Sequence, residues 1–86
     1  MIKVEKRRQG EFLVTVGEGT GTTQHTVSLD DAYYERLAKG GMSREDLIKR
    51  SFEFLLERES KESILSRFNL KVISSYFPEY ESTIGL

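Results

Sequence analysis

The single histidine, His25, is the first candidate for catalysis or metal binding in this sequence. It lies in the stretch TQHTVSL, where polar and apolar residues alternate, and it occupies the apolar side. We therefore interpret it as a structural residue whose ring points into the core. The chain has no cysteine and no second histidine, so it lacks a thiolate nucleophile and the usual zinc ligands. We predict no metal site and no cofactor.

Other residue types that could carry chemistry have simpler interpretations. Gly17, Gly19 and Gly21 suggest a phosphate-binding loop, but no Lys-Ser or Lys-Thr pair follows and the next residues resemble a strand. These glycines are better explained by a hairpin turn. The acids at 30, 31 and 35 fit helix capping and exposure, and Ser28 and Ser43 have no recognisable base nearby. We predict that the protein is not an enzyme.

Polar and basic residues near the N-terminus indicate a binding surface instead. In a strand over residues 22–29, every second side chain faces away from the core, and these are Gln24, Thr26 and Ser28. The first ten residues contain four Lys or Arg and one Glu, a charge of +3, whereas the whole chain carries −1. A basic segment can contact phosphate, and a mildly acidic body repels it. A solvated, frayed terminus is the alternative explanation of this basic segment.

The elements that would position these residues follow from local patterns. Residues 11–16, EFLVTV, alternate as a strand apart from Leu13, and the glycine-rich turn joins them to the strand at 22–29. Asp30 is a plausible N-cap for a short helix that Gly40 and Gly41 end. Ser43 and Asp46 have the spacing of a capping box and open a longer helix.

The longer helix, SREDLIKRSFEFLLERES, has an apolar arc of roughly 200°, which is wide enough to contact more than one neighbour. One side should meet the hairpin. The other side could meet either the C-terminal segment or a second copy, with Ser51 small enough to let another helix approach closely. We predict a homodimer, since small chains often complete their cores by association. Its interface would contain Leu47, Ile48, Ser51, Phe52 and Leu55.

Residues 60–86 look like an appendage of short helices. One helix would carry Ile64, Leu65 and Phe68, and Asn69 would cap another that Pro78 ends. Because the segment is rich in aromatic residues, it should pack either on its own core or on a partner protein.

The arrangement of a strand, a short helix, a glycine turn and a capped longer helix resembles the ribbon-helix-helix repressors of the Arc and MetJ type. The similar stretch is HTVSLDDAYYERLAKGGMSREDLIKRSFEFLLERE, residues 25–59. In that family two chains pair their strands into a ribbon that enters the DNA major groove. The ending RFNLKVISSYFPEYE also resembles that of small uncharacterised bacterial proteins.

This resemblance implies roles for particular residues. Gln24, Thr26 and Ser28 would read base edges, and the start of the second helix at Ser43 and Arg44 would hold a backbone phosphate. The basic arm would add phosphate contacts through Lys6, Arg7 and Arg8.

We therefore expect one α+β domain, 1–86, in which an N-terminal β-hairpin precedes a short helix, a longer amphipathic helix and short C-terminal helices. Its parts would be a basic arm (1–10), the hairpin (11–29), a helix-turn-helix pair (30–59) and the C-terminal helical appendage (60–86). The predicted function is a small dimeric ribbon-helix-helix-like regulator that binds DNA. The alternative is a protein-interaction module or antitoxin-like adaptor that uses the apolar tail. The sequence shows no leader and no membrane-length apolar stretch, so we expect a cytoplasmic protein with no membrane partner.

Overall fold

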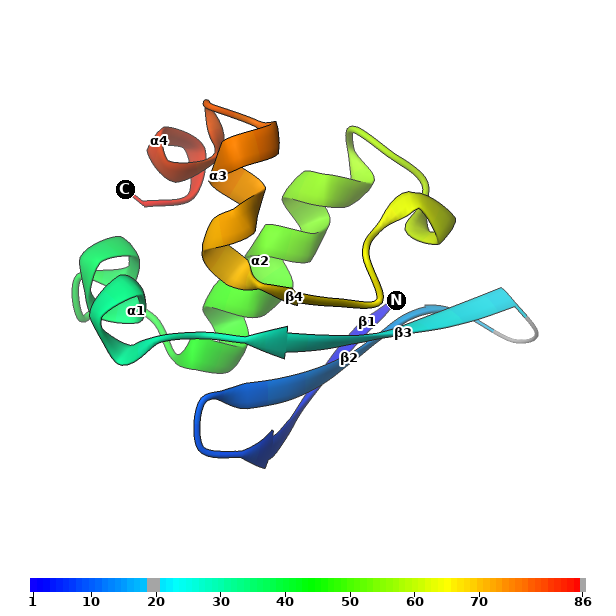
Figure 1. The fold of residues 1–86 in the computed structure, drawn as a ribbon, viewed down its shortest axis with the longest axis horizontal. Helices are drawn as coiled ribbons and strands as arrows, with labels where there is room; N and C mark the ends of the chain where they lie inside the picture. Colours follow the sequence, from blue (N-terminus) through cyan, green and yellow to red (C-terminus); the bar gives the residue numbers. More distant parts are fainter. Residues whose placement is uncertain (19–20, 86) are drawn as a thin grey trace.

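The fold is mixed α+β, with one four-stranded sheet in the order β1-β2-β3-β4. A computed structural model describes residues 1–18 and 21–85 of the chain (Figure 1). The first three strands form an antiparallel meander, and β4 pairs in parallel with β3. The strands are β1 (Ile2–Arg8), β2 (Glu11–Glu18), β3 (Gly21–Ser28) and β4 (Arg67–Asn69).

The helices gather on one side of the sheet (Figure 1). The two longest, α1 and α2, follow β3, and the short helical turns surround β4 and complete the chain. The elements are α1 (Asp31–Ala38), α2 (Arg44–Leu56), η1 (Lys61–Ser63), η2 (Leu70–Val72), α3 (Ile73–Tyr76) and α4 (Tyr80–Ile84). The predicted hairpin and the two helices after it are confirmed. The tip of the predicted glycine turn, residues 19–20, lies outside the described residues.

Their charge led us to expect the first ten residues to be a basic arm, but most of them form a strand, β1. Val4 of β1 pairs with Val14 of β2, and a register shift follows between Lys6 and Arg8. Ile2 and Val4 are partly buried against the core, whereas Lys3 between them is exposed. Burial of Ile2 and Val4, which are spaced as in a strand, completes the covered face of the sheet. This burial stabilises a strand although the neighbouring residues are charged.

Local capping signals set the helix boundaries largely as predicted. The Ser43 hydroxyl accepts a hydrogen bond from the backbone N–H of Asp46 at 3.0 Å, and Asn69 caps η2 through the N–H of Lys71. Asp30 occupies the N-cap position of α1 with extended backbone angles but makes no side-chain cap bond. Gly17 has a φ of +114°, and a Cβ there would lie 2.1 Å from the Gly21 carbonyl oxygen, so this end of β2 requires glycine.

The C-terminal segment is part of the core and not an appendage, which corrects the expected domain plan. Its residues Leu70, Ile73, Tyr80 and Ile84 are buried against α2 and the sheet. Residues 67–69, expected within a helical region, instead extend the sheet as β4. Closure of the core therefore depends on residues 60–85 of the same chain.

The predicted dimer interface is covered by this segment and by the sheet. The exposed fractions of its five residues, Leu47, Ile48, Ser51, Phe52 and Leu55, lie between 0% and 4%. Ser51 does allow a close approach, as its size suggested, but the neighbour is Tyr80 of α4, whose hydroxyl lies 2.6 Å from the Ser51 Oγ. The interface prediction is therefore wrong for this fold, and a dimer would have to use another surface.

Two tyrosines in this interior should make the protein sensitive to alkali. Burial raises the pKa of Tyr80 from 10.0 to about 12, and burial together with a hydrogen bond to Glu81 raises the pKa of Tyr33 still further. Because the unfolded chain loses these phenolic protons first, the contribution of the two tyrosines to folding stability should be constant below about pH 10. Above that pH, ionisation of Tyr80 in the unfolded chain should lower the free energy of unfolding by about 1.4 kcal/mol per pH unit until the folded pKa of about 12 is reached. Tyr33 should add a smaller loss in the same direction, because its hydroxyl is closer to solvent.

Urea unfolding at several alkaline pH values, followed by circular dichroism, would measure this slope. The Tyr80→Phe variant should show only the part of this alkaline loss in stability that is due to Tyr33. A free energy of unfolding that does not change between about pH 10 and 12 would contradict the prediction.

Candidate functional site

The polar triad predicted to read DNA lies on the open face of the sheet. Gln24 is exposed and Thr26 and Ser28 are half-buried, whereas His25 and Val27 between them are buried on the helical side. The predicted outward orientation of the triad is therefore confirmed. Its strand, β3, is however internal to the sheet, with β2 on one side and β4 along residues 26–28 on the other.

Neighbouring strands add residues to this open face that the sequence did not suggest. Thr26 stands between Leu13 of β2 and Arg67 of β4, and paired residues in adjacent strands share a face. Arg67 was missed because its segment was expected to be helical, and three strand residues leave no alternating pattern to recognise. The open face therefore combines the polar triad with Leu13 of β2 and with Arg67, which lies beside Thr26.

The charges of this face largely compensate one another. Lys3 pairs with Glu5 at 3.6 Å, and Arg8 pairs with Glu11 at 3.9 Å. Arg67 takes part in none of the ion pairs found in the described parts of the chain, 1–18 and 21–85. Exposed pairs of this length contribute little energy, so they could exchange partners on binding.

The remaining predicted DNA contacts are spread out or already engaged. Lys6 is opposite Phe12, whose side chain is buried on the helical side, and Arg7 lies at the register shift of β1. Arg44 donates to Asp31 at 2.9 Å, and its guanidinium lies 4.2 Å from the centre of the Tyr34 ring. The structure thus uses Arg44 to hold α1 against α2.

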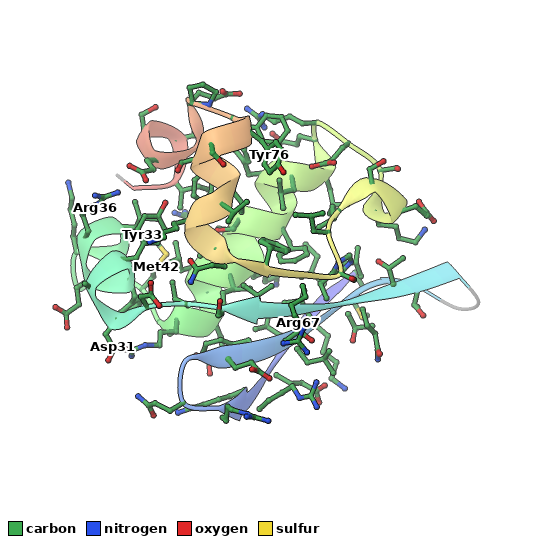
Figure 2. The ribbon with its side chains drawn as sticks, viewed as in Figure 1. Asp31, Tyr33, Arg36, Met42, Arg67 and Tyr76 are labelled. Carbon is green, nitrogen blue, oxygen red and sulfur yellow. The ribbon has the colours of Figure 1, made fainter. Side chains whose placement is uncertain are left out.

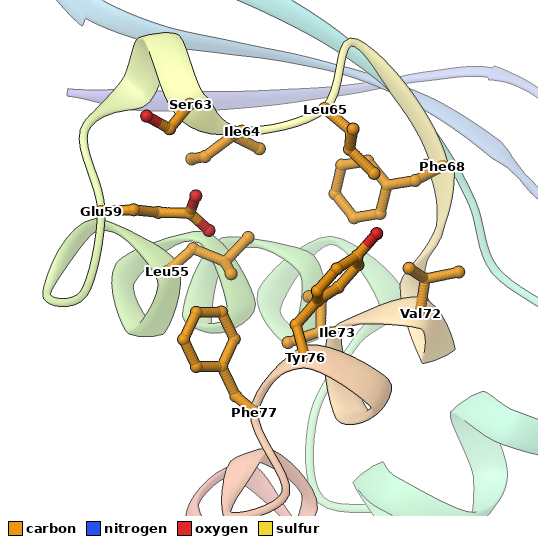
Figure 3. A pocket seen from close by; sticks show the side chains of 10 residues that line it. All are labelled: Leu55, Glu59, Ser63, Ile64, Leu65, Phe68, Val72, Ile73, Tyr76 and Phe77. Atoms are coloured by element: carbon orange, nitrogen blue, oxygen red, sulfur yellow. The ribbon is translucent and has the colours of Figure 1, made fainter.

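A second candidate surface is an apolar groove of about 200 Å³ on the helical side (Figure 3). It lies between the end of α2, the chain from η1 to β4, and the turns η2 and α3. The groove is lined by Leu55, Glu59, Ser63, Ile64, Leu65, Phe68, Val72, Ile73, Tyr76 and Phe77. Ile64 and Ile73 are buried in the core, so the floor of the groove is fixed by the packing of the protein itself.

Two large apolar side chains at this groove remain open to solvent. Leu65 is 48% exposed and Tyr76 is 66% exposed. They come from different segments, one before β4 and the other from the end of α3, and both line the same groove (Figure 3). The sequence signal for this site was the aromatic content of the tail, which indicated that it had to pack on some surface.

His25 holds one wall of the groove in place. Its Nδ1–H donates to the backbone carbonyl of Leu65 at 2.8 Å, which leaves Nε2 to accept from the Thr23 hydroxyl at 2.8 Å. The ring is 2% exposed and lies 5.4 Å from the Phe52 ring. The structural role predicted for this histidine is confirmed, and it fixes the backbone that carries Leu65.

A more polar cleft lies between α1, η2 and α3. There the Glu81 carboxylate accepts hydrogen bonds from the Tyr33 hydroxyl and from Arg36, both at 2.8 Å (Figure 2). Hydroxyls of Ser74 and Ser75 bond to backbone carbonyls of their own helical turns. These groups tie α1 to α4, so we assign this cleft a structural role.

We also compared the chain with known protein families, curated proteins and solved structures. No family model, curated protein or solved structure matches the chain. Within residues 1–18 and 21–85, no group of three or more His, Cys, Asp or Glu side chains is placed to hold a metal ion. The same part of the chain contains no helix with the length and apolar character needed to cross a membrane.

Proposed function

We propose that this protein is a protein-interaction module that binds an apolar side chain of a partner in the groove lined by Leu65 and Tyr76. The observation that carries this proposal is that these two side chains, 48% and 66% exposed, line the same apolar groove. Exposed apolar side chains that line the same concave site suit the burial of a partner's apolar side chain. Tyrosine is also among the residues that most often dominate binding energy at interfaces.

The size of the groove favours one anchoring side chain over a large ligand. Its volume of about 200 Å³ is below the range of about 300–1,000 Å³ that is usual for small-molecule sites. Because Ile64 and Ile73 are buried in the core, the floor does not have to be ordered on binding. A preformed floor lowers the entropy cost of association, so a short partner segment can suffice.

Selection from a phage-displayed library of random peptides, followed by calorimetry on the selected peptides, would test this proposal. The wild-type protein should enrich peptides with a large apolar residue. The double variant Leu65→Ser/Tyr76→Ser should lose at least about tenfold in affinity for them, because truncating interface anchors typically costs more than 1 kcal/mol each. Leu13→Ser, which alters a half-exposed leucine on the open sheet face, is the matched control and should bind normally.

Two results would contradict the proposal. One is that selected peptides bind the double variant as tightly as the wild type. The other is that the wild type sediments as a dimer that the double variant converts to a monomer, since the occupant of the groove would then be a second copy of this chain.

DNA binding is the second candidate, and the open face of the sheet supports it. Gln24 and Thr26 face solvent beside Arg67, which suits contacts to phosphates and base edges. Insertion of β3 as a two-stranded ribbon is disfavoured by its two sheet neighbours. Four strands also span about 14 Å at the usual spacing, against a major groove of about 12 Å. Contact would therefore occur through the face of the sheet.

Fluorescence anisotropy with mixed genomic DNA fragments at low salt would test this second candidate. Arg67→Glu should weaken salt-sensitive binding about tenfold or more, because it replaces a phosphate contact with repulsion. Lys49→Glu changes an exposed lysine of α2 by the same charge and serves as the control. Equal losses in both variants would indicate an effect of net charge alone, and no binding by the wild type would remove this candidate.

A further inference from the structure

We infer that Glu59 makes the groove selective for a partner segment that carries a lysine or arginine next to its apolar anchor. This inference rests on the proposed function of the groove and specifies its ligand. Among the lining residues within the described ranges 1–18 and 21–85, Glu59 is the only acidic one. Its half-buried side chain extends from the chain just after α2 into the groove, towards Leu55 and Ile64 (Figure 3).

Unlike the neighbouring carboxylates, the carboxylate of Glu59 has no cationic partner among the described residues. Arg58 pairs with both Glu57 and Glu79, at 3.3 and 3.1 Å, and Lys61 pairs with Glu62 at 3.0 Å. Both nearby cations are thus engaged with other carboxylates. In the parts of the chain that the structure describes, Glu59 takes part in no ion pair or side-chain hydrogen bond. The groove therefore presents an uncompensated negative charge at one end of an apolar surface.

Lysine and arginine have side chains that match this combination. Their aliphatic stems can cover apolar surface while the charged head remains at a polar site. In the groove, the stem would lie along Leu55 and the head would reach the Glu59 carboxylate. An acidic partner side chain would meet repulsion in the same place.

The same peptide library, selected in parallel on the wild type and on Glu59→Lys, would test this specificity. The wild type should enrich peptides with Lys or Arg beside the apolar anchor, and Glu59→Lys should enrich peptides with Asp or Glu there. Glu53→Lys is the matched control, because it makes the same change at an exposed position of α2 that does not line the groove. Its selected peptides should keep the basic preference.

Affinities of one selected basic peptide would provide a second readout. Replacing Glu59 by Gln should weaken its binding about 1.5- to 5-fold, the range for a partly exposed ion pair, and high salt should remove most of this difference. A peptide in which methionine replaces the basic residue should bind the wild type and Glu59→Gln equally.

The outcomes separate this inference from the proposal on which it rests. Selected peptides that need Leu65 and Tyr76 but show no basic preference, or whose preference survives in Glu59→Lys, would overturn the role of Glu59 and leave the groove as a binding site. Peptides that bind Leu65→Ser/Tyr76→Ser unchanged would overturn both.

Discussion

A chain that ends at Glu59 is expected not to fold. The truncation removes β4, α3 and α4, together with five buried side chains, Ile64, Leu70, Ile73, Tyr80 and Ile84. Burial of a large apolar side chain contributes about 1.5–3 kcal/mol, so their loss amounts to roughly 8–15 kcal/mol, comparable with the whole stability of a small domain. It would also expose Phe52, Phe54 and Leu55 of α2, which would promote aggregation.

Circular dichroism and thermal melting would measure the effect of this truncation. We expect loss of the cooperative transition and a spectrum without stable helix. The full-length double variant Leu65→Ser/Tyr76→Ser is the control, because it changes the same segment only at exposed positions and should melt cooperatively. A truncated chain that still unfolds cooperatively would show that residues 60–86 are an appendage after all.

Tyr80→Ala should be among the most damaging single substitutions in this core, because Tyr80 is one of its largest fully buried side chains. Tyr80 is fully buried, and its ring lies 5.3 Å from the Phe54 ring in an edge-on arrangement. Removing an aromatic ring from a packed core typically costs about 3–5 kcal/mol, because it leaves a cavity that the neighbours only partly fill. Tyr80→Phe keeps the ring and removes only the hydroxyl, so we expect a loss of about 1 kcal/mol.

The hydrogen bond between Tyr80 and Ser51 can be tested separately from the packing of the Tyr80 ring. Ser51 also donates to the Leu47 carbonyl at 2.8 Å, so it keeps one partner in Tyr80→Phe. Ser51→Ala, by contrast, leaves the buried Tyr80 hydroxyl without its partner and should cost about 1–3 kcal/mol. In urea titrations the double variant Ser51→Ala/Tyr80→Phe should lose less than the two single variants combined. Strict additivity would contradict the assignment of this bond.

Several features of the fold could be predicted because their signals are local. The alternation at residues 22–29 identified β3 and its buried histidine, and the Ser43–Asp46 spacing identified the start of α2. In each case the decisive interaction joins residues close in sequence, through strand alternation or through a cap bond three residues away.

The candidate groove could be predicted only in part, because it is assembled from three separate segments. The sequence showed that the tail was apolar enough to pack. It did not show that Ile64 and Ile73 would be buried while Leu65 and Tyr76 would remain exposed. That division depends on which side of each short turn meets α2, and turns of three or four residues have no periodicity that indicates a buried face.

By itself, the sequence determined the local elements of this protein: the hairpin, the two helices and the outward orientation of Gln24, Thr26 and Ser28. Only the tertiary structure decided what covers the wide apolar arc of α2, and the answer is the chain's own end together with its own sheet. The physical reason is that burial of apolar surface is non-directional. An apolar helix face in the sequence therefore predicts that something will cover it. Contacts between distant parts of the chain decide whether the cover is a second copy or the chain itself.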